Sequence, residues 1–164
     1  YDMVHLSYVY GRRDNLIQRI YKVKIAESMR GTNSLWGEER HQVLNASKFF
    51  LCSHQDEQPW IEPLRYALGA AYGIPMVCEE SRDVYPYIPG EEIISAPFWE
   101  LDKVMRQLVT EPYQKYQDQA TRLREKMTVQ YRFRDQVLKA VKDLWERKKI
   151  DQVQILTPLQ ITIK

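Results

Sequence analysis

At 164 residues the chain has the length of one domain with a sizeable hydrophobic core. Its 44% hydrophobic and 28% charged residues exclude wholesale disorder. The 24 basic and 22 acidic residues nearly balance, which gives no indication of a nucleic-acid partner, and no apolar run approaches the roughly 18 residues of a membrane span.

Short apolar runs bounded by turn residues predict five strands, and segments with helical spacing lie between them. The strands are expected at residues 4–10, 23–26, 48–53, 74–78 and 92–96. Asp14 is expected to cap the first helix, whose apolar face is Leu16, Ile17 and Ile20. Residues 27–37 have the composition of a loop, and residues 38–46 predict a short helix.

The helix expected at residues 62–72 ends at Gly73, because Pro75 cannot continue it. Its apolar residues predict the side that faces the core: Ile61, Leu64, Leu68 and Ala71. From Trp99 onward three helical stripes follow, the last formed by Val137, Leu138, Val141, Leu144 and Trp145. Residues 151–164 alternate like a C-terminal strand or tail.

Strands that alternate with helices predict an α/β fold with right-handed crossovers. We expect a single Rossmann-like three-layer domain over residues 1–150, with a mostly parallel sheet and a helical C-terminal region. Ligands of such folds gather at the carboxyl ends of the strands. The segments expected there are residues 11–14, 54–62, 79–90 and 97–99, where polar residues concentrate.

The two cysteines, Cys52 and Cys78, each lie within an apolar strand-like run, which favours buried reduced thiols in a cytoplasmic protein. No signal-peptide pattern opens the chain. With His54 the cysteines resemble part of a metal site, but no fourth ligand follows at a suitable spacing, so we expect no metal.

Five motifs occur in the same order as in the C-terminal half of GT-B glycosyltransferases. They read "VYGRRDNLIQRI", "LWGEERHQVLNASKFFLCSH", "EPLRYALGAAYGIPMVCEE", "YIPGEEII" and "TVQYRFRDQVLKAV". Over residues 4–145 the chain most resembles the branch related to spore-maturation glycosyltransferases. The resemblance implies a domain that binds a nucleotide-diphosphate sugar without a metal or other cofactor. It also implies an N-terminal acceptor domain, in a missing segment or a partner chain, and names no catalytic base here.

The sequence departs from the family at one position of the helix before Gly73. Where the family commonly places a ribose-binding glutamate, five residues before the glycine, this chain has Leu68, although the arginine eight residues before it is kept as Arg65. The ribose contact is therefore expected to be missing or supplied elsewhere. The alternative function is a non-catalytic Rossmann-like interaction module that has lost donor chemistry.

Arg12 and Arg13 follow a strand-ending glycine and precede a helix, so guanidinium charge and free backbone N–H groups are expected to meet an anion there. The planar fork of arginine suits the oxygens of a diphosphate. The family pattern favours Arg13, and the alternative is a solvated basic turn.

Glu62 and Arg65 stand three residues apart, where they either pair on the helix surface or bind a sugar hydroxyl and a phosphate, respectively. His54 follows a strand and is expected to orient the donor, unless neighbouring polar groups satisfy it. Glu79, with Glu80 beside it, is a candidate acceptor of sugar hydroxyl hydrogen bonds or an ordinary strand terminus.

Two further features have alternative readings. Trp60 and Tyr85 could stack on a base or sugar ring, although packing of their loops is the commoner role. The basic residues of 122–149 are interspersed with acidic ones, which indicates a solvated face rather than a nucleic-acid surface. The chain has no Asp-x-Asp, no Gly-x-Gly-x-x-Gly and no P-loop motif.

Overall fold

The computed structural model describes residues 1–20, 22–30, 33–57 and 60–148. The chain divides into two compact units, the first of which is Tyr1–Gln130, and the second begins at Tyr131. The expected domain boundary at residue 150 and the strand or tail at residues 151–164 lie outside the described residues.

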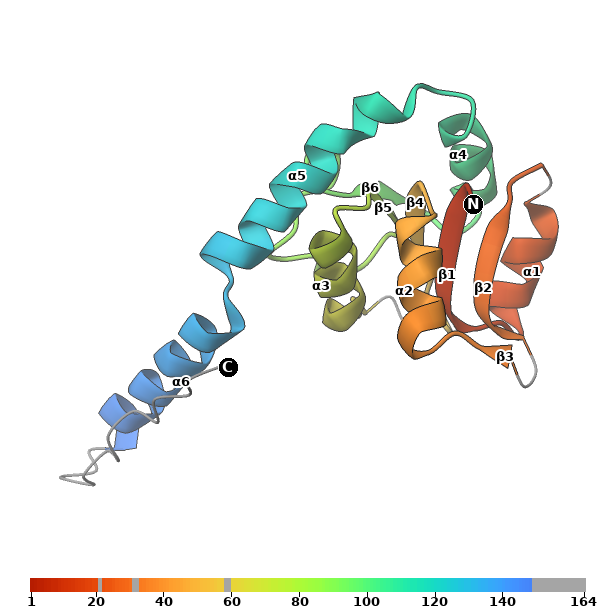
Figure 1. Ribbon diagram of the computed structural model, residues 1–164. Helices are drawn as coiled ribbons and strands as arrows, with labels where there is room; N and C mark the ends of the chain where they lie inside the picture. Colours follow the sequence, from red (N-terminus) through yellow and green to blue (C-terminus); the bar gives the residue numbers. More distant parts are fainter. Residues whose placement is uncertain (21, 31–32, 58–59, 149–164) are drawn as a thin grey trace. The chain divides into compact units, whose positions relative to one another are not determined.

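The first unit is built on a six-stranded sheet in the order β3-β2-β1-β4-β5-β6 (Figure 1). Its strands are β1 (Met3–Tyr8), β2 (Ile25–Arg30), β3 (Asn33–Ser34), β4 (Phe49–Cys52), β5 (Met76–Glu79) and β6 (Ile94–Ala96). Every neighbouring pair is parallel except β2 and β3. The expected Rossmann-like α/β fold with a mostly parallel sheet is thereby confirmed.

Helices connect the strands and continue beyond the sheet. In the first unit they are α1 (Arg12–Arg19), α2 (Gly37–Asn45), α3 (Pro63–Tyr72), α4 (Leu101–Leu108), the 3₁₀ helix η1 (Tyr113–Tyr116), α5 (Gln117–Glu125) and the π-helical segment η2 (Lys126–Gln130). The second unit contains α6 (Phe133–Lys148). The helical region expected after Trp99 is confirmed.

Alternate residues of the central strands face opposite sides of the sheet, so two hydrophobic clusters form. The first cluster takes Val4, Phe50, Cys52, Met76 and Cys78 from the strands. The second takes Met3, Phe49, Leu51, Val77 and Ala96. Residues of α2, α3 and α5 cover the first cluster, and residues of α1 and α4 cover the second, which gives three layers.

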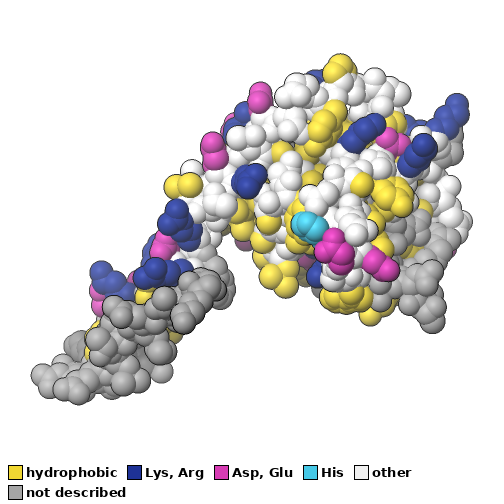
Figure 2. Space-filling view, in the orientation of Figure 1, with side chains coloured by type: hydrophobic (Ala, Val, Ile, Leu, Met, Phe, Trp, Pro, Cys, Tyr) yellow, Lys and Arg dark blue, Asp and Glu magenta, His cyan; other side chains and the backbone are white. Residues whose placement is uncertain are grey.

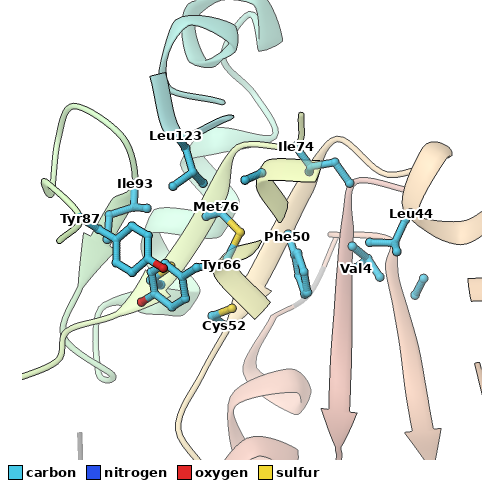
Figure 3. Close-up of a cluster of buried hydrophobic side chains, with 13 residues drawn as sticks. Val4, Leu44, Phe50, Cys52, Tyr66, Ile74, Met76, Tyr87, Ile93 and Leu123 are labelled. Atoms are coloured by element: carbon cyan, nitrogen blue, oxygen red, sulfur yellow. The ribbon is translucent and has the colours of Figure 1, made fainter. Parts of the chain in front are cut away.

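The first cluster contains a pair of aromatic rings beside the sulfur-rich centre of the sheet (Figure 3). The rings of Tyr66 and Tyr87 stack with 4.4 Å between their centroids. Burial raises the pKa of Tyr87 to about 12, so its hydroxyl stays protonated at neutral pH. This pair joins α3 to the loop that follows β5.

The start of α1 differs from the expectation, because Asp14 does not cap it. The helix begins at Arg12, and Gly11 holds the N-cap position with a φ of 55°. A positive φ is accessible to glycine at little cost, so the turn is made there. Asp14 instead lies in the first turn, where its carboxylate faces the positive end of the helix dipole.

Two other expectations are wrong in part. Residues 27–37 are not all loop, since β2 runs from Ile25 to Arg30 and pairs with β3. Backbone hydrogen bonds to the neighbouring strand allow polar residues to continue β2. On α3, Leu64 is 86% exposed and Ala71 is also exposed, whereas Ile61 and Leu68 do pack against the first cluster.

The surface of the described residues carries charge of both signs, and Figure 2 shows basic and acidic side chains interspersed on the face in view. In the second unit the apolar stripe of α6 is exposed at Val137, Leu138, Val141 and Leu144. Within the described part of the chain, none of the helices combines the length and apolarity needed to cross a membrane.

Candidate functional site

A cavity of about 940 Å³ opens at the carboxyl edge of the parallel sheet. Its lining comes from the segments that follow four strands: Gly11, Arg12, Asn15, Asp56, Glu57, Glu79, Glu80, Ser81, Arg82, Pro97, Phe98 and Trp99. All of these except Asn15 lie in the four segments that the sequence predicts at the ligand end. The expected position of these segments, at the carboxyl ends of the strands, is confirmed.

The topology of the sheet explains why the cavity forms at this place. From β1 the chain passes through α1 to β2 on one side, while β4 pairs with β1 on the other. The crossovers therefore diverge at the carboxyl ends of β1 and β4, which leaves a crevice between them. Gly11 and Arg12, at the start of α1, line this crevice.

Arg12 is the side chain that links the two walls of the cavity. Its Nη1 and Nη2 atoms donate to the two carboxylate oxygens of Glu79, at 2.7 and 2.5 Å. The guanidinium also lies over the ring of Phe98, 3.5 Å from the centroid. An arginine that is both forked onto a carboxylate and stacked on an aromatic ring has a fixed orientation.

Glu79 has a second partner behind the cavity. The backbone N–H of His54 donates to Oε2 of Glu79 at 2.9 Å. The His54 ring is buried, and its Nε2 lies 3.2 Å from both the carbonyl oxygen of Glu80 and Oγ of Ser81. His54 therefore fastens the loop after β4 to the loop after β5 rather than facing the cavity.

Arg13, Glu62 and Arg65 form a second polar group beside the cavity. Arg13 donates twice to the carbonyl oxygen of Ser53, at 3.1 and 2.9 Å, and once to Glu62 at 3.1 Å. The other oxygen of Glu62 lies 2.6 Å from Nη2 of Arg65. Arg13 and Arg65, each a candidate phosphate ligand in the sequence, here share a carboxylate of the chain itself.

Neighbouring arginine charges affect the titration of this buried group. Burial, followed by the charge of Arg65, lowers the pKa of Arg13, which the nearby Glu62 partly offsets. His5 lies on β1 with its Nε2 3.2 Å from Oγ of Ser53. Burial and the charges of Arg13 and Arg65 lower its pKa to about 3, so the ring is neutral at physiological pH.

The chemistry of the cavity lining suits a ligand with many hydroxyl groups. Four carboxylates and two guanidinium groups line it, together with the rings of Phe98 and Trp99. Carboxylates accept hydrogen bonds from hydroxyls, arginines donate to oxygens, and aromatic rings offer flat apolar faces. Trp99 is 72% exposed, so its ring remains available to a bound molecule.

The structure separates the predicted site residues into three positions. Arg12 and Glu79 line the cavity, His54 lies behind it, and Arg13, Glu62 and Arg65 stand beside it around Ser53. Adjacent residues of a helix point about 100° apart, and here Arg12 turns to the cavity while Arg13 turns to the carbonyl of Ser53. Although the family pattern favours Arg13, Arg12 is the one that faces the cavity.

Phe98 and Trp99 were not predicted as aromatic ligands. The predicted aromatic residues, Trp60 and Tyr85, are exposed but do not belong to the cavity lining among the described residues. A usable signal was present, because Phe98 and Trp99 directly follow a predicted strand, and that segment was expected at the ligand end.

Among the residues that the structure describes, no three or more His, Cys, Asp or Glu side chains are grouped so as to hold a metal ion. No protein-family model matches the chain, and no curated protein matches it either.

Proposed function

We propose that the chain is the donor-binding domain of a GT-B glycosyltransferase, which transfers a sugar from a nucleotide-diphosphate donor to an acceptor. The observation that carries this proposal is the cavity at the carboxyl edge of the sheet, into which the first turn of α1 presents Arg12. Its volume of about 940 Å³ is in the upper part of the range of small-molecule sites.

The lining supports a role for each part of such a donor. Arg12, at the N-terminus of α1, is placed for the diphosphate, where the helix dipole adds to its charge. The carboxylates of Glu79 and Glu80 can accept from sugar or ribose hydroxyls, and Trp99 can stack on a flat ring. Arg12 would stabilise the negative charge that develops on the leaving diphosphate.

The second polar group has a supporting role in this proposal. Arg13 and Arg65 hold Glu62 and the carbonyl of Ser53 together. Asp56 and Glu57, which follow Ser53 along the chain, line the cavity. The general base and the acceptor site would come from an N-terminal domain or a partner chain. Cys52 and Cys78 are free thiols, in keeping with a cytoplasmic protein.

The test is a calorimetric titration of the full chain with UDP, GDP and their sugar conjugates. We expect binding of at least one of them, and a loss of about tenfold or more in affinity in Arg12→Gln, because one charge-assisted hydrogen-bond pair is removed. Arg134→Gln, on the exposed surface of α6, is the matched control and should bind as the unmodified chain does. Equal affinities in the two variants would refute the role of Arg12.

One observation favours a second function, a non-catalytic interaction module. Leu68 occupies the position of the family's ribose-binding glutamate and packs against the first hydrophobic cluster. A side chain used for packing cannot supply the ribose contact, so a domain that has lost donor binding would have this feature. Absence of binding across the whole nucleotide and nucleotide-sugar series would favour this module over the transferase.

A further inference from the structure

The ion pair between Arg12 and Glu79 holds the position that a diphosphate would need. We propose that Glu79 is an internal competitor of the ligand's phosphate groups: it must release Arg12 when the ligand binds, and it returns to Arg12 when the ligand leaves. This inference rests on the proposed function and identifies the residue that sets the affinity of the site for phosphates.

The geometry of the pair carries the argument. The two oxygens of Glu79 meet Nη1 and Nη2 of Arg12, which is the outer edge of the guanidinium fork. Two oxygens of a phosphate group bind the same edge in the same way. One face of the guanidinium is covered by Phe98. A phosphate that needs the outer edge can therefore reach it only by displacing the carboxylate.

The surroundings of Glu79 allow this exchange. Glu79 keeps the backbone N–H of His54 as a hydrogen-bond partner at 2.9 Å when Arg12 turns to a ligand. Its carboxylate is therefore not left without a donor, which would be costly for a side chain that is almost fully buried. Both side chains line the cavity, but that of Arg12 is 21% exposed and that of Glu79 only 7%, so a ligand reaches the guanidinium more readily.

Glu80 provides a matched comparison within the same cavity. It is the next residue along the chain, also lines the cavity, and carries the same charge, but its side chain is exposed. The fork of Arg12 is occupied by Glu79, not by Glu80. Removal of either charge changes the electrostatic potential of the cavity in the same direction, but only removal of the Glu79 charge frees Arg12.

The experiment measures the affinity of the full chain for inorganic pyrophosphate, UDP and GDP in Glu79→Gln, Glu80→Gln, Arg12→Gln and the double variant Arg12→Gln/Glu79→Gln. We expect Glu79→Gln to bind pyrophosphate about tenfold more tightly, with slower dissociation, since the competing charged hydrogen bonds are removed. Glu80→Gln should give a clearly smaller rise. The gain from Glu79→Gln should disappear when Arg12 is also replaced.

The outcomes separate this inference from the proposed function. If the unmodified chain binds a nucleoside diphosphate, but Glu79→Gln binds no more tightly or gains no more than Glu80→Gln, then Glu79 is not a competitor. If neither the unmodified chain nor any variant binds these ligands, the proposed function fails and the inference with it. Should Glu79→Gln not fold, Glu79→Asp replaces it: its shorter carboxylate should release Arg12 partly and raise the affinity, and no rise would overturn the proposal.

Discussion

The imidazole of His5 is fully buried next to two arginines, so its protonation is coupled to folding. In the folded state its pKa is lowered from 6.5 to about 3, so below pH 6.5 the unfolded chain binds the proton more readily than the folded one. The stability that depends on neutral His5 should therefore be present above about pH 6.5 and be lost as the pH falls. From this residue alone, the free energy of unfolding should fall by about 2 kcal/mol between pH 7 and pH 5. Urea unfolding at several pH values measures it.

His5→Gln is the control for this prediction, because glutamine keeps an amide donor near Oγ of Ser53 and does not titrate. The variant should be less stable at pH 7 but show a flatter dependence on pH between 7 and 5. Carboxylates titrate mostly below this window, so they affect both proteins equally. Parallel pH profiles for the two proteins would show that His5 is not the group responsible.

At the residue scale the sequence predicted which side chains gather at the site better than it predicted what each one faces. The six polar residues predicted for the donor site lie in or next to the cavity region, whereas the aromatic candidates Trp60 and Tyr85 do not line it. The orientation of Arg12 and Arg13 depends on where α1 begins, and one residue of difference rotates a side chain by about 100°. The sequence placed Asp14 at the N-cap, whereas Gly11 holds that position and the helix begins at Arg12, which places both arginines in its first turn.

At the scale of elements, α3 packs on the sheet through its smallest residue. A Cβ added to Gly69 would lie 1.9 Å from Sδ of Met76 and 3.4 Å from a ring carbon of Phe50. Met76 is completely buried, so it has little room to move. Gly69→Ala should therefore lower the free energy of unfolding by about 1–3 kcal/mol through overpacking, although alanine is the better helix former. Chemical denaturation measures the change.

Replacement of Met76 tests whether overpacking is the cause. In the background Met76→Ala the obstructing sulfur is absent, so adding Gly69→Ala should cost nothing further or should stabilise the helix by up to about 1 kcal/mol. A double-mutant cycle with an interaction energy near zero would show that the contact between α3 and β5 is not the cause.

The close approach at Gly69 also explains why the buried face of α3 was only partly predictable. Hydrophobic size placed Leu64 and Ala71 towards the core, yet the fully buried residues of this helix are Tyr66, Gly69 and Ala70. Small residues let the helix lie near the sheet, and a tyrosine fills the space towards Tyr87. A search for apolar periodicity does not count glycine as a core residue, whereas the close packing of α3 on the sheet requires glycine at position 69. The end of the helix was predictable, because Gly73 adopts the left-handed conformation with a φ of 64°.

For the whole molecule, topology was the most predictable level, since strands alternating with helices permit few arrangements. The four segments expected at the ligand end supply nearly the entire cavity lining. The edge strand β3 was missed, because two polar residues form a strand only through backbone pairing with β2, which side-chain periodicity does not register. The arrangement of the main strands and helices was therefore predictable, whereas an edge strand held only by backbone pairing was not.

The division of the chain at Gln130 leads to a prediction about which part is sufficient for folding and binding. The buried members of both hydrophobic clusters lie no later in the chain than Leu123, and the partly buried Met127 also precedes the boundary. A protein that ends at residue 130 therefore loses none of these contacts, and loses the exposed apolar stripe of α6. It should unfold cooperatively with a Tm within about 4 °C of the full chain and bind the same nucleotides. Circular dichroism of the full chain and of the shorter protein measures Tm, and calorimetry of both measures binding. A large fall in Tm, or a loss of binding by the shorter protein alone, would show that the second unit contributes to the fold or the site of the first.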